Sequence, residues 1–161
     1  MAKFIVTADF VQKENAMNWI YNDGGRKDAG YRGETRDCVT RAIAIATGIS
    51  YQTVYDSINS LSASERPTKN KKRSSARTGV QKSTYKSYLN DLGWKWIPTM
   101  LVGQGCKVHL RSDELPSGIL IVSVSRHLTV VKDGVIYDTH DCSRGGNRCV
   151  YGYWVKGVKT Q

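Results

Sequence analysis

The sequence predicts an α+β fold, with helices in the first half of the chain and strands in the second. Apolar residues recur at helical spacing in residues 38–47, 51–61 and 81–91. The stretches after residue 93 instead show apolar runs or alternation typical of strands. This order predicts N-terminal helices packed on a C-terminal antiparallel sheet. A chain of 161 residues has the length of one domain, so we expect residues 1–161 to form a single domain.

The helix of residues 38–47 is the best defined. Asp37 or Thr35 would be its N-cap, and Gly48 would end it in a left-handed conformation. The second helix begins after Ser50, whose hydroxyl suits an N-cap. Apolar residues on several sides of residues 38–47 indicate that this helix is mostly buried.

Strands follow the third helix and are separated by turn residues. The predicted strands are residues 94–98, 119–124, 127–131, 135–138 and 148–155. Near the N-terminus, residues 3–10 predict a first strand, residues 12–21 a short helix or a packed loop, and the glycine-rich residues 22–33 a loop.

The net charge of +10 comes mostly from one segment. Between positions 66 and 77 the chain has six basic residues and no acidic one: Arg66, Lys69, Lys71, Lys72, Arg73 and Arg77. Residues 62–78 therefore predict a basic, flexible loop with little to bury. It could hold nucleic acid through phosphates or an acidic protein partner. A solvated surface is the simpler interpretation, because the segment has no interleaved aromatic residues.

No apolar run in the chain is long enough to cross a membrane, so we expect no membrane association. Asp9 interrupts the apolar N-terminus, which makes it a poor signal peptide. The sequence thus predicts a cytoplasmic protein whose four cysteines are reduced thiols.

Cys38 is the candidate nucleophile because it opens the helix of residues 38–47. The N-terminus of a helix carries partial positive charge, which favours the thiolate form of cysteine. Acyl chemistry also requires a proton acceptor next to the sulfur. Without such a partner, an inert buried thiol would be the simpler interpretation.

His127 and Asp138 could provide the proton acceptor and its carboxylate partner. They lie on either side of a predicted hairpin turn within residues 132–134. A two-residue turn at 132–133 or at 133–134 would place both side chains on one face of the sheet. A carboxylate on one imidazole nitrogen would fix the tautomer and support the imidazolium.

The possible turns differ in what lies opposite His127. The turn at 132–133 places Asp138 there, and the turn at 133–134 places His140 there with Asp138 diagonal. A three-residue loop would bring Asp141 nearer instead, so Asp141 is the reserve partner.

The segment in which Asp37 precedes Cys38 at the start of a buried helix resembles the nucleophile segment of papain-like cysteine peptidases, especially their compact branch. The C-terminal half resembles them too. A strand follows the Leu-Pro pair at 115–116, the next strand begins with His127, and the strand after a tight turn ends in Asp138. The chain is also similar to small proteins of tailed bacteriophages.

This resemblance implies a papain-like fold with Cys38 as nucleophile, His127 as general base and acid, and Asp138 as the residue that orients the imidazole. It implies a peptide or protein substrate and, for a phage protein, the host cytoplasm. It also implies an oxyanion donor upstream of the cysteine, normally Gln, but position 32 of this chain is Arg. The remaining candidates for that donor are Gln12, Asn18, Asn22 and Thr35.

Two other interpretations remain open. Cysteine and histidine recur in the C-terminal half, and zinc is bound by such residues in compact pairs. The residues concerned are Cys106, His109, His140, Cys142 and Cys149. The spacing fits zinc only partly, so we expect neither a metal nor another cofactor.

The second interpretation is a non-catalytic papain-like binding module that uses the basic patch of Lys69, Lys71, Lys72 and Arg73. We favour a cysteine hydrolase that cleaves an amide, isopeptide or thioester bond, or transfers the acyl group. The oligomeric state cannot be read from the sequence.

Overall fold

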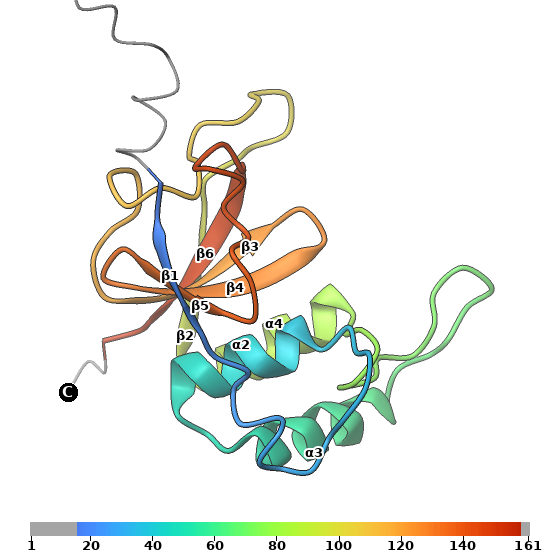
Figure 1. Cartoon of the computed structure of the whole chain (residues 1–161). Coiled ribbons are helices and arrows are strands. Elements are labelled where there is room, and N and C mark those ends of the chain that lie inside the picture. The colour runs from blue at the N-terminus through green and yellow to red at the C-terminus, as the bar shows by residue number, and fades with distance from the viewer. Residues whose placement is uncertain (1–15, 159–161) are drawn as a thin grey trace, which may run out of the picture.

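The computed structural model describes residues 16–158 and arranges them as a six-stranded sheet with helices packed on one face (Figure 1). The strands are β1 (Asn18–Tyr21), β2 (Trp94–Pro98), β3 (Ile119–Val124), β4 (His127–Lys132), β5 (Val135–Asp138) and β6 (Val150–Lys156). Their order across the sheet is β1-β5-β4-β3-β6-β2. The α+β class is therefore confirmed. The strand predicted for residues 3–10 lies outside the described residues.

The helices are α2 (Cys38–Thr47), α3 (Tyr51–Ser62) and α4 (Lys82–Asp91), within two residues of their predicted limits. Asp37 is the N-cap residue of α2, but its carboxylate makes no capping hydrogen bond. Gly48 ends α2 with φ 74°, a conformation that glycine adopts without steric cost. The Ser50 side chain caps α3 by accepting a hydrogen bond from the backbone N–H of Thr53. None of the helices in the described part of the chain is long and apolar enough to span a membrane.

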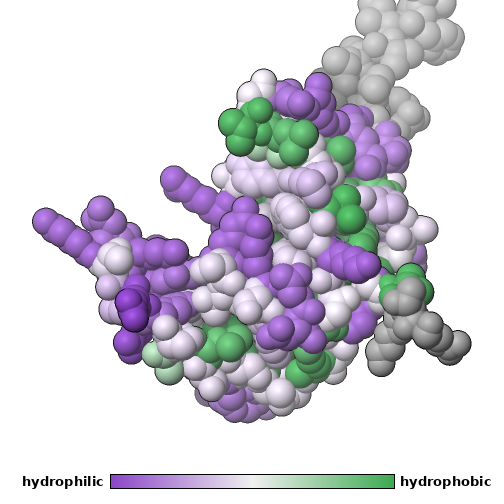
Figure 2. Space-filling model, turned by 180° about the vertical axis from the view of Figure 1, so that it is seen from behind, coloured by the Kyte–Doolittle hydropathy of each residue, from purple (hydrophilic) through white to green (hydrophobic). Residues whose placement is uncertain are grey.

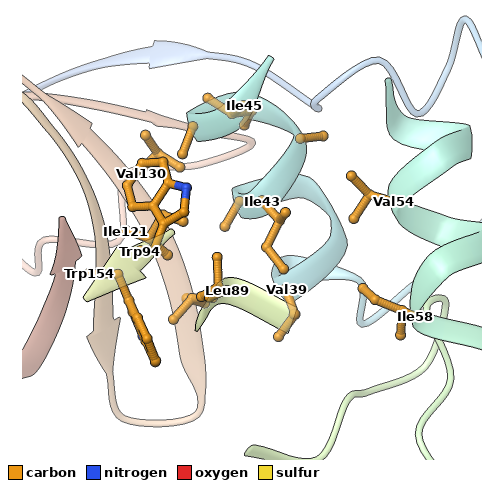
Figure 3. Packing of buried hydrophobic residues seen from close by; sticks show 14 of the residues in the cluster. Val39, Ile43, Ile45, Val54, Ile58, Leu89, Trp94, Ile121, Val130 and Trp154 are labelled. Carbon is orange, nitrogen blue, oxygen red and sulfur yellow. The ribbon is translucent and has the colours of Figure 1, made fainter. Parts of the chain in front are cut away.

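Helix α2 is the centre of the larger hydrophobic core (Figure 3). Every residue from 39 to 46 is buried, because α2 packs on β3 and β4 with one side and on α3 with the other. Figure 3 shows Ile43 between the sheet and Val54 of α3. Burial of each such side chain stabilises the fold by about 1.5–3 kcal/mol. A second cluster, which includes Leu120 and Ile136, lies on the opposite face of the sheet.

A two-residue turn at Asp133 and Gly134 joins β4 to β5. Both residues have positive φ, 46° and 78°, as a type I′ hairpin turn requires. Val130 then pairs with Tyr137. Of the two registers expected for a two-residue turn, the structure has the one with the turn at 133–134, and the His140 ring lies 5.2 Å from that of His127.

The prediction of a wholly antiparallel sheet was wrong at one edge. Residues 18–21 form a strand rather than a helix or loop, and this strand, β1, pairs in parallel with β5. All four residues of β1 are exposed, Trp19 and Tyr21 included, so the strand has no alternation of buried and exposed side chains. Its strand conformation depends on a partner more than a hundred residues away, which local patterns do not reveal.

The basic segment after α3 has two parts, and the expectation that it buries almost nothing was wrong for the second. Its tip, residues 66–73, is exposed and extends from the molecule as a hydrophilic arm (Figure 2). Ser74 and Ala76 are buried again. The Glu65 carboxylate accepts hydrogen bonds from the Ser74 N–H at 2.6 Å and from the hydroxyl of Thr84 on α4. These contacts attach both ends of the arm to the helices.

Cys106 and Cys149 form a disulfide, so the expectation of four reduced thiols was wrong for this pair. Their Cα atoms are 5.8 Å apart although 43 positions separate them in the sequence. The backbone of Val108 and Leu110 pairs with that of Val150 and Arg148, and this local pairing brings the two sulfurs together. Cys38 and Cys142 remain free thiols.

Candidate active site

A cavity of about 900 Å³ opens where the first turn of α2 meets the start of β4 and the end of β5. Cys38 and His127 both line it, although they are far apart in the sequence. Asp138 is buried directly behind the histidine. The structure thus brings together the three candidate catalytic residues that the sequence predicted.

Cys38 begins α2 as its first helical residue. Burial by itself would raise the pKa of the thiol, but a hydrogen bond with His127 and the charge of that imidazole outweigh burial. The Leu128 backbone and the Arg41 charge act in the same direction, so the pKa lies below its ordinary value of 9.0. A cysteine in such surroundings has thiolate character.

His127 makes its closest polar contact with Asp138. Its Nε2 lies 2.6 Å from Asp138 Oδ2. Burial opposes the charge on both groups, but their mutual hydrogen bond and attraction raise the pKa of His127 and lower that of Asp138. The imidazole therefore has the Asp138 carboxylate on one nitrogen, and the nearby thiols of Cys142 and Cys38 raise its pKa further. Asp141, the reserve partner, accepts hydrogen bonds from the N–H and hydroxyl of Ser143 instead.

A buried polar network joins helix α2 to this histidine–carboxylate pair. Arg41, one turn after Cys38, contacts Asp37 and places its Nη2 3.4 Å from Asp138 Oδ1. Asp37 also accepts hydrogen bonds from the hydroxyls of Thr35, at 2.7 Å, and Tyr51, at 2.7 Å. The guanidinium thus connects the nucleophile helix to the carboxylate of the sheet. Helical spacing places Arg41 on the turn after Cys38, but nothing in the sequence indicated its partner on β5.

The predicted oxyanion donors are not confirmed. Gln12 lies outside the described residues, and Asn18 does not line the cavity. Asn22 lines a different cavity, where its side chain accepts a hydrogen bond from the Gly24 N–H. Thr35 does line the cavity, but its hydroxyl is used by Asp37 and Arg26. A donor of this kind needs a polar group turned to the cavity, and local sequence does not specify that orientation.

Sequence reasoning missed Tyr85, a partly buried residue of α4 that lines the cavity with Cys38. Burial raises the pKa of its phenol, and the charge of Cys38 raises it further, so the hydroxyl stays protonated beside the sulfur. Within residues 16–158 the Tyr85 hydroxyl makes no hydrogen bond, and the residue lines the cavity. In the sequence, Tyr85 falls on the apolar face of the predicted helix, so no local signal distinguished this residue from core residues.

The zinc grouping considered from the sequence is not assembled. Cys106 and Cys149 are joined in the disulfide, and the ring of His109 lies 3.1 Å from Glu114. In the described part of the chain, the group that could hold a metal is His127, Asp138 and Cys142, whose donor atoms lie within 4.8 Å of one another. Two ligands of one zinc ion lie about 3.3 Å apart, so a metal there would have to break the 2.6 Å His127–Asp138 hydrogen bond.

The exposed basic patch of Lys69, Lys71, Lys72 and Arg73 lies outside the cavity. The segment reaches the cavity only at its end, where residues 78–80 form part of the wall. The patch and the candidate catalytic residues are thus separate features of the surface.

Comparison with models of known protein families, with curated proteins and with solved structures finds no match for this chain. Its fold and cavity are therefore interpreted from its own residues.

Proposed function

We propose that the chain is a papain-like cysteine hydrolase that cleaves an amide, isopeptide or thioester bond through a covalent acyl-enzyme. The supporting observation is that Cys38, at the start of a buried helix, shares a cavity with an imidazole that is hydrogen-bonded to Asp138. Each group has the environment that its role requires: positive charge near the sulfur and a carboxylate behind the histidine.

In the proposed reaction the Cys38 sulfur attacks the substrate carbonyl carbon and forms a carbon–sulfur bond. The imidazolium of His127 then gives its proton to the leaving group as the original bond breaks. Water attacks the thioester, and the neutral imidazole accepts its proton. The carbon–sulfur bond breaks, the acid is released, and the Cys38 thiolate and the His127 imidazolium form again. If an amine replaces water, the same residues transfer the acyl group.

Two groups would stabilise the oxyanion in place of the glutamine found in papain-like peptidases. The first is the backbone N–H of Cys38, which Asp37 leaves uncapped at the start of α2. The second is the hydroxyl of Tyr85, on the part of α4 that lines the cavity. Both are donors in a partly buried site, where such hydrogen bonds are most effective.

The test uses p-nitrophenyl acetate as a small acyl donor. We expect nitrophenol release together with an acetyl group on Cys38 that hydroxylamine removes, as judged by peptide mass. Cys142, the other free thiol, is buried next to the same histidine, so the control is His127→Ala, in which Cys38 should be acetylated far more slowly. Tyr85→Phe should slow acylation by about 100-fold, the size typical for one oxyanion donor, while the melting temperature changes little. Acetylation of Cys38 at an unchanged rate in His127→Ala would overturn the proposal.

A second candidate function is a binding module that holds nucleic acid on the arm of residues 66–73. The observation in its favour is that five basic side chains are exposed there. Such binding would weaken steeply with salt. Oligonucleotide binding that is lost on changing Lys69, Lys71 and Lys72 to Gln, together with an unreactive Cys38, would favour this function over the hydrolase.

A further inference from the structure

The rim of the cavity is rich in positive charge, and this charge comes from three separate elements. Arg36 precedes α2, Lys82 opens α4, and Arg126 lies in the turn between β3 and β4. All three side chains are exposed. Within residues 16–158, none of them takes part in an ion pair.

The acidic residues of the cavity do not balance this charge. Asp37 is fully buried and already engaged by Arg41 and the Tyr51 hydroxyl. Glu34 is the one exposed carboxylate among the described lining residues, against three exposed cations. A ligand that enters the cavity therefore meets a net positive rim.

Lys82 occupies a defined position on this rim. Its amino group lies 5.7 Å from the centre of the Trp96 ring, within the range of a cation–π contact. Lys86, one turn later, lies 5.5 Å from the same ring. This arrangement places positive charge along α4, on both sides of Tyr85 in the sequence and on the element that lines the cavity together with Cys38.

We propose that the substrate of this site is an acidic peptide segment, with Asp or Glu side chains flanking the bond that Cys38 attacks. This inference rests on the proposed function. Carboxylates on either side of the scissile bond would reach Arg36, Lys82 and Arg126, while the carbonyl meets the sulfur between them. A peptide suits the site better than nucleic acid, because the reaction needs an acyl carbon and nucleic acid offers none at its backbone.

The first test compares two alkylating reagents of similar size on Cys38, the anionic iodoacetate and the neutral iodoacetamide. We expect Arg36→Gln/Lys82→Gln/Arg126→Gln to lower the rate ratio of iodoacetate to iodoacetamide by about tenfold at low ionic strength. The matched control, Lys69→Gln/Lys71→Gln/Lys72→Gln, removes the same charge from the arm and should change the ratio less than about twofold. Equal ratios in the two variants would overturn the inference.

The second test identifies the class of ligand. A polyglutamate peptide should protect Cys38 of the wild-type chain from iodoacetamide, whereas a single-stranded oligonucleotide of equal charge should protect it less. Stronger protection by the oligonucleotide would overturn the assignment to peptide. If Cys38 reacts no faster than a free thiol, the proposed function fails. The reagent ratio still measures the charge at the cavity, so the two failures are distinguishable.

Discussion

At the scale of single residues, the site depends on the surroundings of His127. Its ring has Asp138 on one nitrogen, the thiols of Cys142 and Cys38 nearby, and the exposed His140 ring 5.2 Å away. The Asp138 carboxylate is held in turn by Arg41. The protonation state of Cys38 thus depends on residues that do not touch the sulfur.

Asp138→Asn should lower the rate of Cys38 alkylation at pH 7 by about tenfold or more. The carboxamide has no charge to stabilise the imidazolium, and a change of one pKa unit is a factor of ten in thiolate. The rate constant is measured with iodoacetamide and peptide mapping. Asp141→Asn is the matched control, because Asp141 is exposed and does not contact His127. A rate unchanged in Asp138→Asn would show that the pair does not activate the thiol.

The contribution of the His127–Asp138 pair to stability should be largest between pH 3.8 and pH 6.5, the ordinary pKa values of the two groups. Because folding lowers the pKa of Asp138, its contribution is present above pH 3.8 and disappears as pH falls through the folded value. Because folding raises the pKa of His127, its contribution is complete below pH 6.5 and disappears as pH rises through the folded value.

The measurement is the difference in free energy of unfolding between the wild type and Asp138→Asn, from urea titrations that extend beyond both ends of this window, towards the folded pKa values of about 2 for Asp138 and about 11 for His127. A difference that does not vary with pH would contradict the linkage.

At the scale of elements, the β4–β5 turn decides which side chains meet. A two-residue turn places His127 and Asp138 on one side of the hairpin, whereas one extra residue would turn Asp138 away. Gly134 is required here for two reasons. Its φ is 78°, and a Cβ at this position would lie 3.2 Å from the Cβ of Ser112.

Gly134→Ala should destabilise the protein by about 1–2 kcal/mol in urea unfolding, since the left-handed conformation and the crowding both disfavour alanine. Gly103→Ala is the control for the left-handed conformation alone. Gly103 has φ 79°, and a Cβ added there would have nothing within 4 Å. The free energy of unfolding of this control variant should fall by about 1 kcal/mol or less. Equal losses in the two variants would mean that Ser112 moves aside without cost.

At the scale of the whole molecule, the sheet has a core on each face, and the two cores have different supports. Helices α2, α3 and α4 cover one face. The other face is covered by buried residues such as Leu110 and Leu115, which come from the long connection between β2 and β3. The Cys106–Cys149 disulfide ties this connection to the chain just before β6. The side of the molecule that has no helix is therefore held partly by a covalent bond.

Reduction of the disulfide should lower the free energy of unfolding by about 4 kcal/mol at most, because a loop spanning 43 positions gains entropy in the unfolded chain. Urea unfolding with and without dithiothreitol measures the loss. In Cys106→Ser/Cys149→Ser the reductant should have no effect. Coincident unfolding curves of the oxidised and reduced wild type would contradict this prediction.

The sequence by itself determined the helices, most of the strands and the identity of the candidate catalytic residues. These features depend on local chemistry: apolar spacing in α2, a glycine where positive φ is required, and a cysteine at the start of a helix. The pairing of His127 with Asp138 was the favoured prediction, because the twofold alternation of a strand allows it for either two-residue turn; Asp141 stayed the reserve partner until the structure fixed the turn.

Only the tertiary structure decided the rest. It placed β1 beside β5, joined Cys106 to Cys149, connected Arg41 to Asp138 and brought Tyr85 into the same cavity as Cys38. Each of these contacts joins segments that are distant in the sequence. Local propensity cannot specify such partners, because the free energy that selects them comes from packing the whole chain.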